Sequence, residues 1–159
     1  MMRKVVATLS KIVRCGLLVG AVGLMMTDQP TAAVSTHKIH AKGVGQDLGG
    51  GNTQARIIGG GLLSGTTTAH FEITGGTYPV FLIVGDVTFT TNQGATLIVH
   101  ISGTFDVASG EFSASGPVTD STGKLAGATG ILTLSGVEDF SDGAFVEDVS
   151  GSISVDLAP

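Results

Sequence analysis

The sequence of 159 residues is poor in cysteine and in large aromatic side chains. It contains one cysteine, Cys15, one tyrosine, Tyr78, and no tryptophan. A single cysteine excludes a disulfide framework within the chain, so packing must stabilise the fold. The near absence of Tyr and Trp also leaves no stacking platform for sugars or nucleic-acid bases.

Basic residues are scarce as well. After residue 33 the chain has four basic residues against twelve acidic ones, a net charge of −8 with histidine neutral. A surface of this sign repels phosphate groups, and no basic stripe with interleaved aromatic residues is present. We therefore expect neither nucleic acid nor an anionic membrane surface as a partner.

Residues 1–33 have the pattern of a secretory signal peptide. The basic stretch MMRKVVATLSKIVR precedes the apolar block CGLLVGAVGLMM, and small residues follow at Thr31 and Ala33. The block is shorter than the roughly 20 apolar residues of a membrane-spanning helix. We predict cleavage after Ala33, giving a cysteine-free chain that is secreted, periplasmic or in the cell envelope and is not integral to the membrane. The alternative is an uncleaved membrane anchor.

Most of the remaining chain alternates between apolar and polar residues with a period of two. The alternation is clearest in ATLIVHISGTFD, residues 95–106, and AFVEDVSGSISVDL, residues 144–157. Residues 66–74 and 78–91 also favour strands, with a turn at Gly75-Gly76 and a bulge at Gly85. No segment after residue 33 has a helical stripe of apolar residues. Residues 34–53 are polar and glycine-rich, which predicts a flexible arm before a domain of residues 54–159.

Glycine supplies both the turns and the curvature of the predicted sheet. Glycine-containing turns separate the strands at residues 92–94, 108–110 and 141–143. Further glycines lie on the apolar faces of strands, where they allow strong coiling around a small barrel: Gly103, Gly116, Gly136 and Gly151. A closed barrel also removes exposed strand edges. We predict a single all-β domain, an antiparallel barrel.

The stretch TDSTGKLAGATGILTLSG, residues 119–136, combines glycine and lysine in a way that could suggest a phosphate-binding loop. Such a loop needs Gly-Lys followed by Ser or Thr, ahead of a helix. Here Leu125 follows Lys124, and a strand pattern follows in place of a helix. The stretch is therefore interpreted as a turn that starts a strand.

The same stretch resembles the TGG[ST]GxFxGAxG segment of the allene oxide cyclase and dirigent barrel superfamily, including small secreted bacterial members. The resemblance covers roughly residues 87–157, and the matching motif residues are Thr122, Gly123, Leu125, Gly127, Ala128 and Gly130. It implies a calycin-type barrel of eight antiparallel strands, often trimeric in the plant relatives. The sequence departs from the family in two ways. Leu125 stands where an aromatic residue is commonest, and the functional acids and aromatics of the plant enzymes have no alignable match.

Glu147 is the best candidate for a catalytic or ligand-binding residue. Its position in the alternation puts it on the apolar face with Phe145 and Val149. A carboxyl group inside a barrel has a raised pKa, which suits acid–base chemistry or binding of a polar ligand group. The alternative is a solvated position at the barrel rim, because an unpaired buried carboxylate is costly.

Other polar residues point less clearly to a site. The four histidines share no spacing typical of zinc ligands. An acidic cluster could bind Ca²⁺ with loop carbonyls, although a solvated turn is the simpler interpretation: Glu138, Asp139, Asp142, Glu147 and Asp148. We therefore expect no metal and no cofactor.

Three functions remain open from the sequence. We predict a non-catalytic module that binds a small apolar molecule or a protein partner, with a dimer or trimer as the expected homo-oligomer. The alternatives are a cyclase or isomerase, or dirigent-like steering of a reactive intermediate, with Glu147 as an acid or electrostatic group, and a self-associating envelope protein without a ligand. A cavity of roughly 300 Å³ with Glu147 at its wall would favour the first two.

Overall fold

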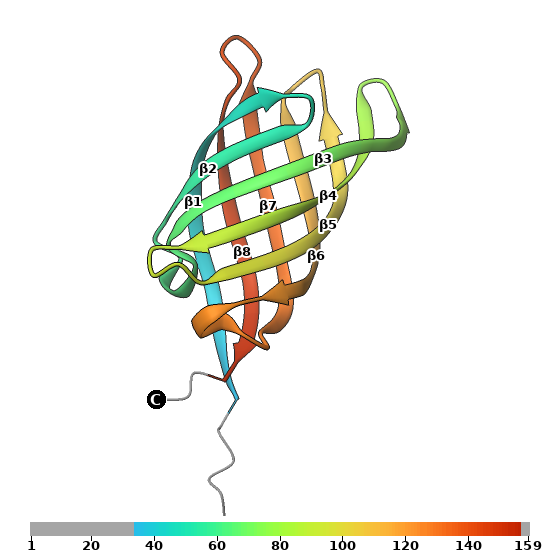
Figure 1. The fold of residues 1–159 in the computed structure, drawn as a ribbon. Helices are drawn as coiled ribbons and strands as arrows, with labels where there is room; N and C mark the ends of the chain where they lie inside the picture. The colour runs from blue at the N-terminus through green and yellow to red at the C-terminus, as the bar shows by residue number, and fades with distance from the viewer. Residues whose placement is uncertain (1–33, 157–159) are drawn as a thin grey trace, which may run out of the picture. The chain divides into compact units, whose positions relative to one another are not determined.

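A computed structural model describes residues 34–156, which form a closed antiparallel barrel of eight strands (Figure 1). The strands are β1 (Ser35–Gly49), β2 (Asn52–Ile58), β3 (Gly65–Thr77), β4 (Val80–Thr91), β5 (Thr96–Asp106), β6 (Glu111–Ser121), β7 (Thr129–Asp139) and β8 (Ala144–Val155). This confirms the predicted all-β class and the eight-stranded barrel. The predicted signal peptide, residues 1–33, lies outside the described residues.

The strands follow one another around the barrel in sequence order. Each pairs with its neighbours in the chain, and β1 closes the barrel by pairing with β8, for example Val44 with Val146. Closure gives every strand a neighbour on both sides. No helical element within residues 34–156 is long and apolar enough to span a membrane.

Strand β1 corrects one prediction. We predicted a flexible arm over residues 34–53, but residues 35–49 form the longest strand of the barrel and pair with both β2 and β8. The barrel therefore begins at residue 35, not at residue 54. Gly43 and Gly45 weaken the strand pattern in the sequence, yet each lies opposite a large inward-facing residue of β8, Glu147 and Phe145 respectively.

The β3–β4 hairpin also differs from the prediction. The turn lies at Tyr78-Pro79 and not at Gly75-Gly76, which belong to β3. The irregular pairing lies between Ile73 and Gly75, and Gly85 pairs regularly with Phe71. The side chain of Phe71 packs so closely over Gly85 that a Cβ atom there would lie 2.6 Å from Phe71 Cδ1. Gly85 thus makes room for an aromatic ring without a bulge.

One end of the barrel is filled. Two short 3₁₀ helices, η1 (Gly61–Leu63) and η2 (Gly123–Leu125), insert Leu63 and Leu125 into the core, where both are buried. Residues 119–136 form the end of β6, helix η2 and most of β7, which confirms the predicted strand-entry turn. Strand β1 begins and β8 ends at this closed end (Figure 1).

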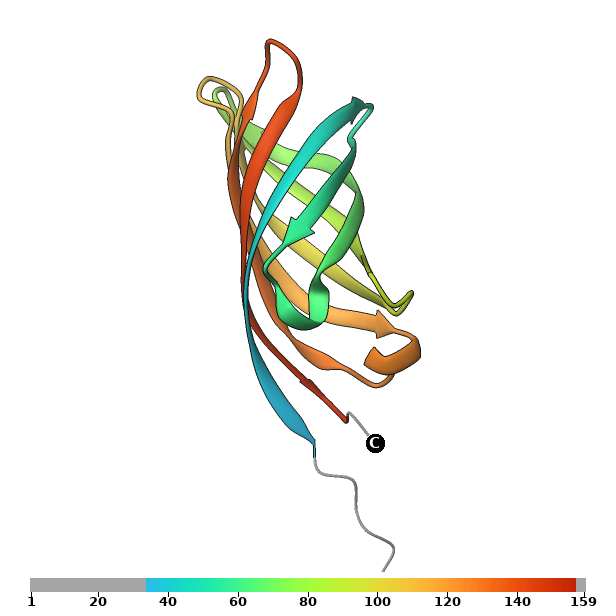
Figure 2. The same ribbon diagram turned by 90° about the vertical axis from the view of Figure 1, so that its left-hand side faces the viewer.

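The opposite end carries four hairpin turns, at residues 50–51, 78–79, 107–110 and 140–143. Figure 2 shows these turns at the far end of the barrel from η1 and η2. Two of these turns, at 108–110 and 141–143, were predicted from their glycines, and the predicted turn at 92–94 lies between β4 and β5. All three predictions are confirmed, with Gly94, Gly110 and Gly143 at positive φ. No helix covers the hairpin end within the described residues, and we refer to it as the open end.

Candidate functional site

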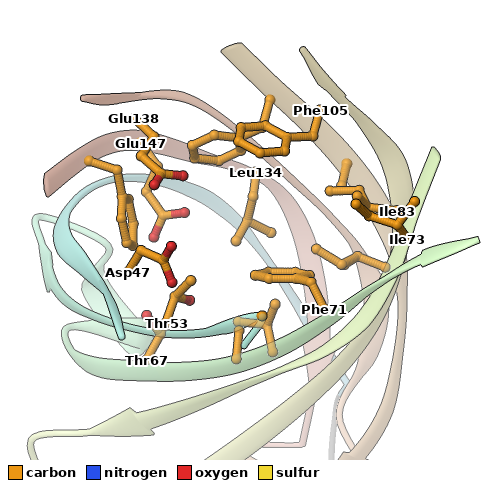
Figure 3. Close-up of a pocket in the computed structure, with 17 residues that line it drawn as sticks. Asp47, Thr53, Thr67, Phe71, Ile73, Ile83, Phe105, Leu134, Glu138 and Glu147 are labelled. Atoms are coloured by element: carbon orange, nitrogen blue, oxygen red, sulfur yellow. The ribbon is translucent and has the colours of Figure 1, made fainter. Parts of the chain in front are cut away.

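A cavity of about 260 Å³ lies inside the barrel toward the open end, and all eight strands contribute to its wall (Figure 3). Most of the wall is apolar: Ala69, Phe71, Ile73, Ile83, Val87, Ile101, Phe105, Phe112, Ala114, Leu134 and Phe145. Phenylalanines of this wall take part in two aromatic pairs. Phe112 and Phe145 meet edge to face with ring centroids 6.0 Å apart, and Phe105 meets Phe140 at 5.9 Å.

The polar part of the wall lies on one side of the cavity. Asp47 of β1, Glu138 of β7 and Glu147 of β8 gather there, with Thr53 and Thr67 close to Asp47 (Figure 3). These three strands are neighbours because β8 lies between β7 and β1. No lysine, arginine or histidine of the described residues lines the cavity.

Glu147 occupies the inward position that its alternation with Phe145 and Val149 predicts. Its exposed fraction is only 7%, so it does not occupy a solvated rim position. Its carboxyl group has no hydrogen-bond or ion-pair partner among residues 34–156. Loss of hydration on burial raises the pKa of Glu147 to about 7. Glu147 can therefore hold or release a proton near neutral pH.

The neighbouring strands provide the space that Glu147 occupies. Gly43 of β1 and Gly136 of β7 are its two partners in strand register. A Cβ atom at Gly43 would lie 2.5 Å from both Cγ and Oε1 of Glu147. The carboxyl group is thus held against the backbone of β1, and its position depends on a glycine there.

Glu138 and Asp47 complete the acidic side of the cavity. The pKa of Glu138 is raised, mainly by burial and to a smaller extent by repulsion from the nearby charge of Asp47. Backbone hydrogen bonds fix both segments: the amide of Glu138 donates to the carbonyl of Gly110 at 3.0 Å, and the amide of Asp47 to that of Gly143 at 2.8 Å. Asp47 also accepts a hydrogen bond from the amide of Gly49 at 2.8 Å.

The predicted acidic cluster is divided between the cavity and the solvent. Asp139, Asp142 and Asp148 are exposed, and Asp148 pairs with Lys42 at 2.8 Å on the outer surface. Glu138 and Glu147 instead line the cavity. In residues 34–156 no three His, Cys, Asp or Glu side chains are grouped closely enough to hold a metal ion.

Sequence reasoning missed Asp47 and Glu138 as cavity residues. Asp47 fell within the predicted arm, and Glu138 was assigned to the acidic turn. Their positions in the sequence could have indicated this. Asp47 lies at an even spacing from Gly43 and Gly45, and Glu138 lies at an even spacing from Leu134. These alternations place both acids on the inward face.

The histidines do not converge on a site. His100 lies 2.8 Å from Asp86 and His70 lies 3.0 Å from Asn52, both pairs on the outer surface. His40 is exposed, whereas His37 is half-buried near the start of β1. None of them lines the cavity.

The residues on which the predicted resemblance to the barrel superfamily rests lie at the closed end and outside the cavity wall: Thr122, Gly123, Leu125, Gly127, Ala128 and Gly130. Leu125 and Ala128 are buried in the core, and the hydroxyl of Thr122 lies 2.6 Å from that of Thr96. The segment thus closes the barrel.

Searches of protein-family models, curated protein sequences and solved structures found no match to this chain. Membership of the allene oxide cyclase and dirigent superfamily therefore stays a prediction.

The cavity supports a narrow range of chemistry. Among the described residues its wall contains no Ser, Cys, Lys or His side chain, so the possible nucleophiles are the hydroxyls of Thr53 and Thr67 and the carboxylates. Its carboxyl groups can donate or accept hydrogen bonds, transfer a proton, or balance a positive charge.

Proposed function

We propose that this protein is a non-catalytic binding module for a small, mainly apolar molecule that carries one polar group. The observation that carries this proposal is the apolar cavity with the buried, unpartnered carboxyl group of Glu147 in its wall. Ligand pockets commonly combine apolar walls with a few polar groups that orient the ligand.

The size of the cavity limits the ligand. Its volume of about 260 Å³ lies just under the roughly 300 Å³ at which pockets for drug-sized molecules begin. Ile73 lines the cavity and is 62% exposed, so the wall extends to the solvent at the open end. A compact molecule with about one ring or a short branched chain suits these dimensions.

Occupation of the cavity would also stabilise the barrel. An empty apolar cavity leaves its lining atoms without contact partners, which destabilises a fold. A ligand restores those contacts and binds only the folded chain, so it raises the free energy of unfolding. A cavity favours a small ligand over a protein partner, because a protein partner needs an extended surface.

Native mass spectrometry of the protein purified from the organism that produces it tests the proposal. We expect a small molecule to remain bound to the wild-type protein. Ala69→Phe places an aromatic ring in the cavity and is expected to abolish this adduct, whereas Thr68→Phe places the ring on the outer face and serves as the control. A wild-type protein without any adduct would contradict the proposal and favour the structural envelope role.

The second candidate is a cyclase, an isomerase or a dirigent-like protein that steers a reactive intermediate. The observation in its favour is the pKa of Glu147 near 7 in an apolar cavity, because a general acid or base works best when its pKa is close to the operating pH. The co-purified molecule and its product would be followed by mass spectrometry with wild type and Glu147→Gln. Loss of turnover in a variant that circular dichroism shows to be folded supports catalysis, and absence of turnover in wild type contradicts it.

We further propose that the chain is exported, on the strength of the signal pattern in residues 1–33. The intact mass from the same experiment gives the site of cleavage and the oligomeric state. A mass that includes residues 1–33 would contradict cleavage after Ala33.

A further inference from the structure

The cavity combines an apolar wall with negative charge on one side only. Asp47, Glu138 and Glu147 line it from three adjacent strands, and no positively charged side chain of residues 34–156 does so. From this arrangement we infer that the ligand is a protonated amine with an apolar body, its ammonium group placed at Glu147 and its body against the apolar wall on the opposite side of the cavity. The inference rests on the proposed binding function and adds the chemical class of the ligand.

The burial of Glu147 without a hydrogen-bond partner is a second observation that points to a ligand, independent of the acidic side chains around it. Its carboxyl group faces the cavity with an exposed fraction of 7% and without a hydrogen-bond partner in the described chain. Buried polar groups in proteins nearly always have a partner. A ligand that donates hydrogen bonds from the cavity would supply the partner that Glu147 lacks.

The sign of the charge selects the amine over other donors. Negative groups in a poorly hydrated cavity interact strongly with a cation, because the surroundings screen charge less than bulk water does. Hydrogen bonds between an ammonium group and a carboxylate are also stronger than those between neutral groups. The same three carboxyl groups would repel an anionic ligand, such as a fatty acid.

Within residues 34–156 no lysine or arginine side chain takes this place. Lys42 pairs with Asp148 on the outer surface, and Arg56 and Lys124 are exposed and absent from the cavity wall. A bare metal ion also fits poorly, since the described acidic residues do not group as a metal site. The phenylalanine rings favour an organic cation, because a ring face attracts positive charge.

The apolar body of the ligand fits the opposite side of the cavity. Phe71, Ile73 and Ile83 lie across the cavity from the acidic side (Figure 3). An amine with one aromatic ring and a short linker could place its ring against these residues while its ammonium group reaches Glu147. Such a molecule is compatible with the volume of about 260 Å³.

The pH dependence of binding follows from the groups that face the site. The titratable groups lining the cavity are Asp47 from β1, Glu138 from β7 and Glu147 itself; the facing residues of β2 and β3, Thr53 and Thr67, do not titrate. Acidification protonates Glu147, so affinity for the amine falls as the pH drops below about 7. The pKa of Glu138 is also raised, so its protonation acts in the same direction. Affinity also falls when a primary amine loses its proton near a pH of about 10.

A matched series of small molecules tests the inference. Isothermal titration calorimetry at pH 8 would compare 2-phenylethylamine with 2-phenylethanol and 3-phenylpropionate on the purified protein, after removal of any bound molecule. We expect the amine to bind at least about tenfold more tightly than the alcohol, and the carboxylate not to bind. At pH 5 the advantage of the amine over the alcohol should disappear.

Two charge-neutralising variants on the same strand locate the effect. Glu147→Gln should remove the tenfold preference for the amine, whereas Asp148→Asn, which makes the same charge change on the outer surface, should preserve it. Circular dichroism would confirm that both variants are folded.

The outcomes separate this inference from the proposed function. If the alcohol binds as tightly as the amine, or if Glu147→Gln keeps the preference, the amine inference is wrong and the binding function stands. If none of the three binds while a neutral or acidic molecule co-purifies with the protein, the amine inference is wrong, whereas the proposed binding function stands. If none binds and the native protein carries no adduct, both fail.

Discussion

The side chain of Glu147 lies directly over the backbone of Gly43, its register partner on β1. A Cβ atom at residue 43 would come within 2.5 Å of Oε1 of Glu147, so only glycine leaves the carboxyl group in its observed place. This relationship explains why a strand that closes the barrel contains a glycine at an inward position. It also connects the position of the carboxyl group to a residue that makes no polar contact with it.

Gly43→Ala is therefore expected to displace the carboxyl group without unfolding the barrel. The atoms that clash belong to the flexible Glu147 side chain, so the cost to stability should be about 1 kcal/mol, at the low end of the range for an added methyl group. Affinity for 2-phenylethylamine should fall about as much as in Glu147→Gln. Val44→Ala, which changes the exposed neighbour, is the control. Unchanged affinity in Gly43→Ala would show that the position of the carboxyl group does not matter.

Gly136→Ala should have a different effect, although Gly136 is the other register partner of Glu147. A Cβ atom there would meet the carbonyl oxygen of Val146 and lie 2.9 Å from Cα of Glu147, and backbone atoms cannot move aside as a side chain can. We expect a loss of about 3 kcal/mol in the free energy of unfolding, measured by urea denaturation. A loss no greater than that of Gly43→Ala would contradict the close approach of β7 and β8.

Glu147 should make the stability of the protein depend on pH. In the folded state it keeps its proton up to about pH 7, whereas in the unfolded chain it releases the proton near 4.5. The folded state thus binds more protons between these values, and the free energy of unfolding falls as the pH rises from about 4.5 to 7. The full effect is about 3 kcal/mol.

Comparison with Glu147→Gln isolates this effect. The variant lacks the titrating group, so its own free energy of unfolding does not contain this contribution. The free energy of unfolding of the variant minus that of wild type should therefore increase by about 3 kcal/mol from pH 4 to pH 8. Glu138, whose pKa is also raised, acts in the same direction in both proteins. Urea denaturation at a series of pH values would measure the difference. A difference that is constant with pH would contradict burial of the charge.

Leu125 should be essential for the closed end of the barrel. Its side chain is 2% exposed and packs in the core from helix η2. Leu125→Ala is expected to cost about 2–5 kcal/mol of the free energy of unfolding. Ile131→Ala removes the same number of carbon atoms at a site that is 61% exposed and should cost much less. Equal losses in the two variants would mean that η2 does not seal the core.

Much of the barrel could be predicted because most of its strands separate an apolar from a polar face. The alternation in residues 96–106 and 144–155 follows the observed burial, and it correctly places Glu147 inside. Strand β1 was missed because its inward positions near the open end are Gly43, Gly45 and Asp47, which carry no apolar signal. These residues are small or polar because larger groups of β8 occupy the interior beside them.

The composition of the cavity could be predicted only in part, for a related reason. Which inward faces lie side by side depends on the register and closure of the barrel, and the paired residues of β1 and β8 are 98 to 120 positions apart in the sequence. Asp47 comes close to Glu147 only through that pairing, whereas Glu138 lies beside Glu147 through the β7–β8 hairpin, in which Gly136 pairs with Glu147. The shift in β3 near Ile73 was also invisible, since the irregular pairing depends on the partner strand.

Both proposals depend on the carboxyl group of Glu147 lying unpartnered inside an apolar cavity. The most direct test is a carbon-13 NMR titration of the glutamate side-chain carboxyl groups in the ligand-free protein, with Glu147→Gln used to assign the resonance. We predict that Glu147 titrates near pH 7 and that 2-phenylethylamine lowers this value. A carboxyl group that titrates near 4.5, as it does when solvated, would contradict the account.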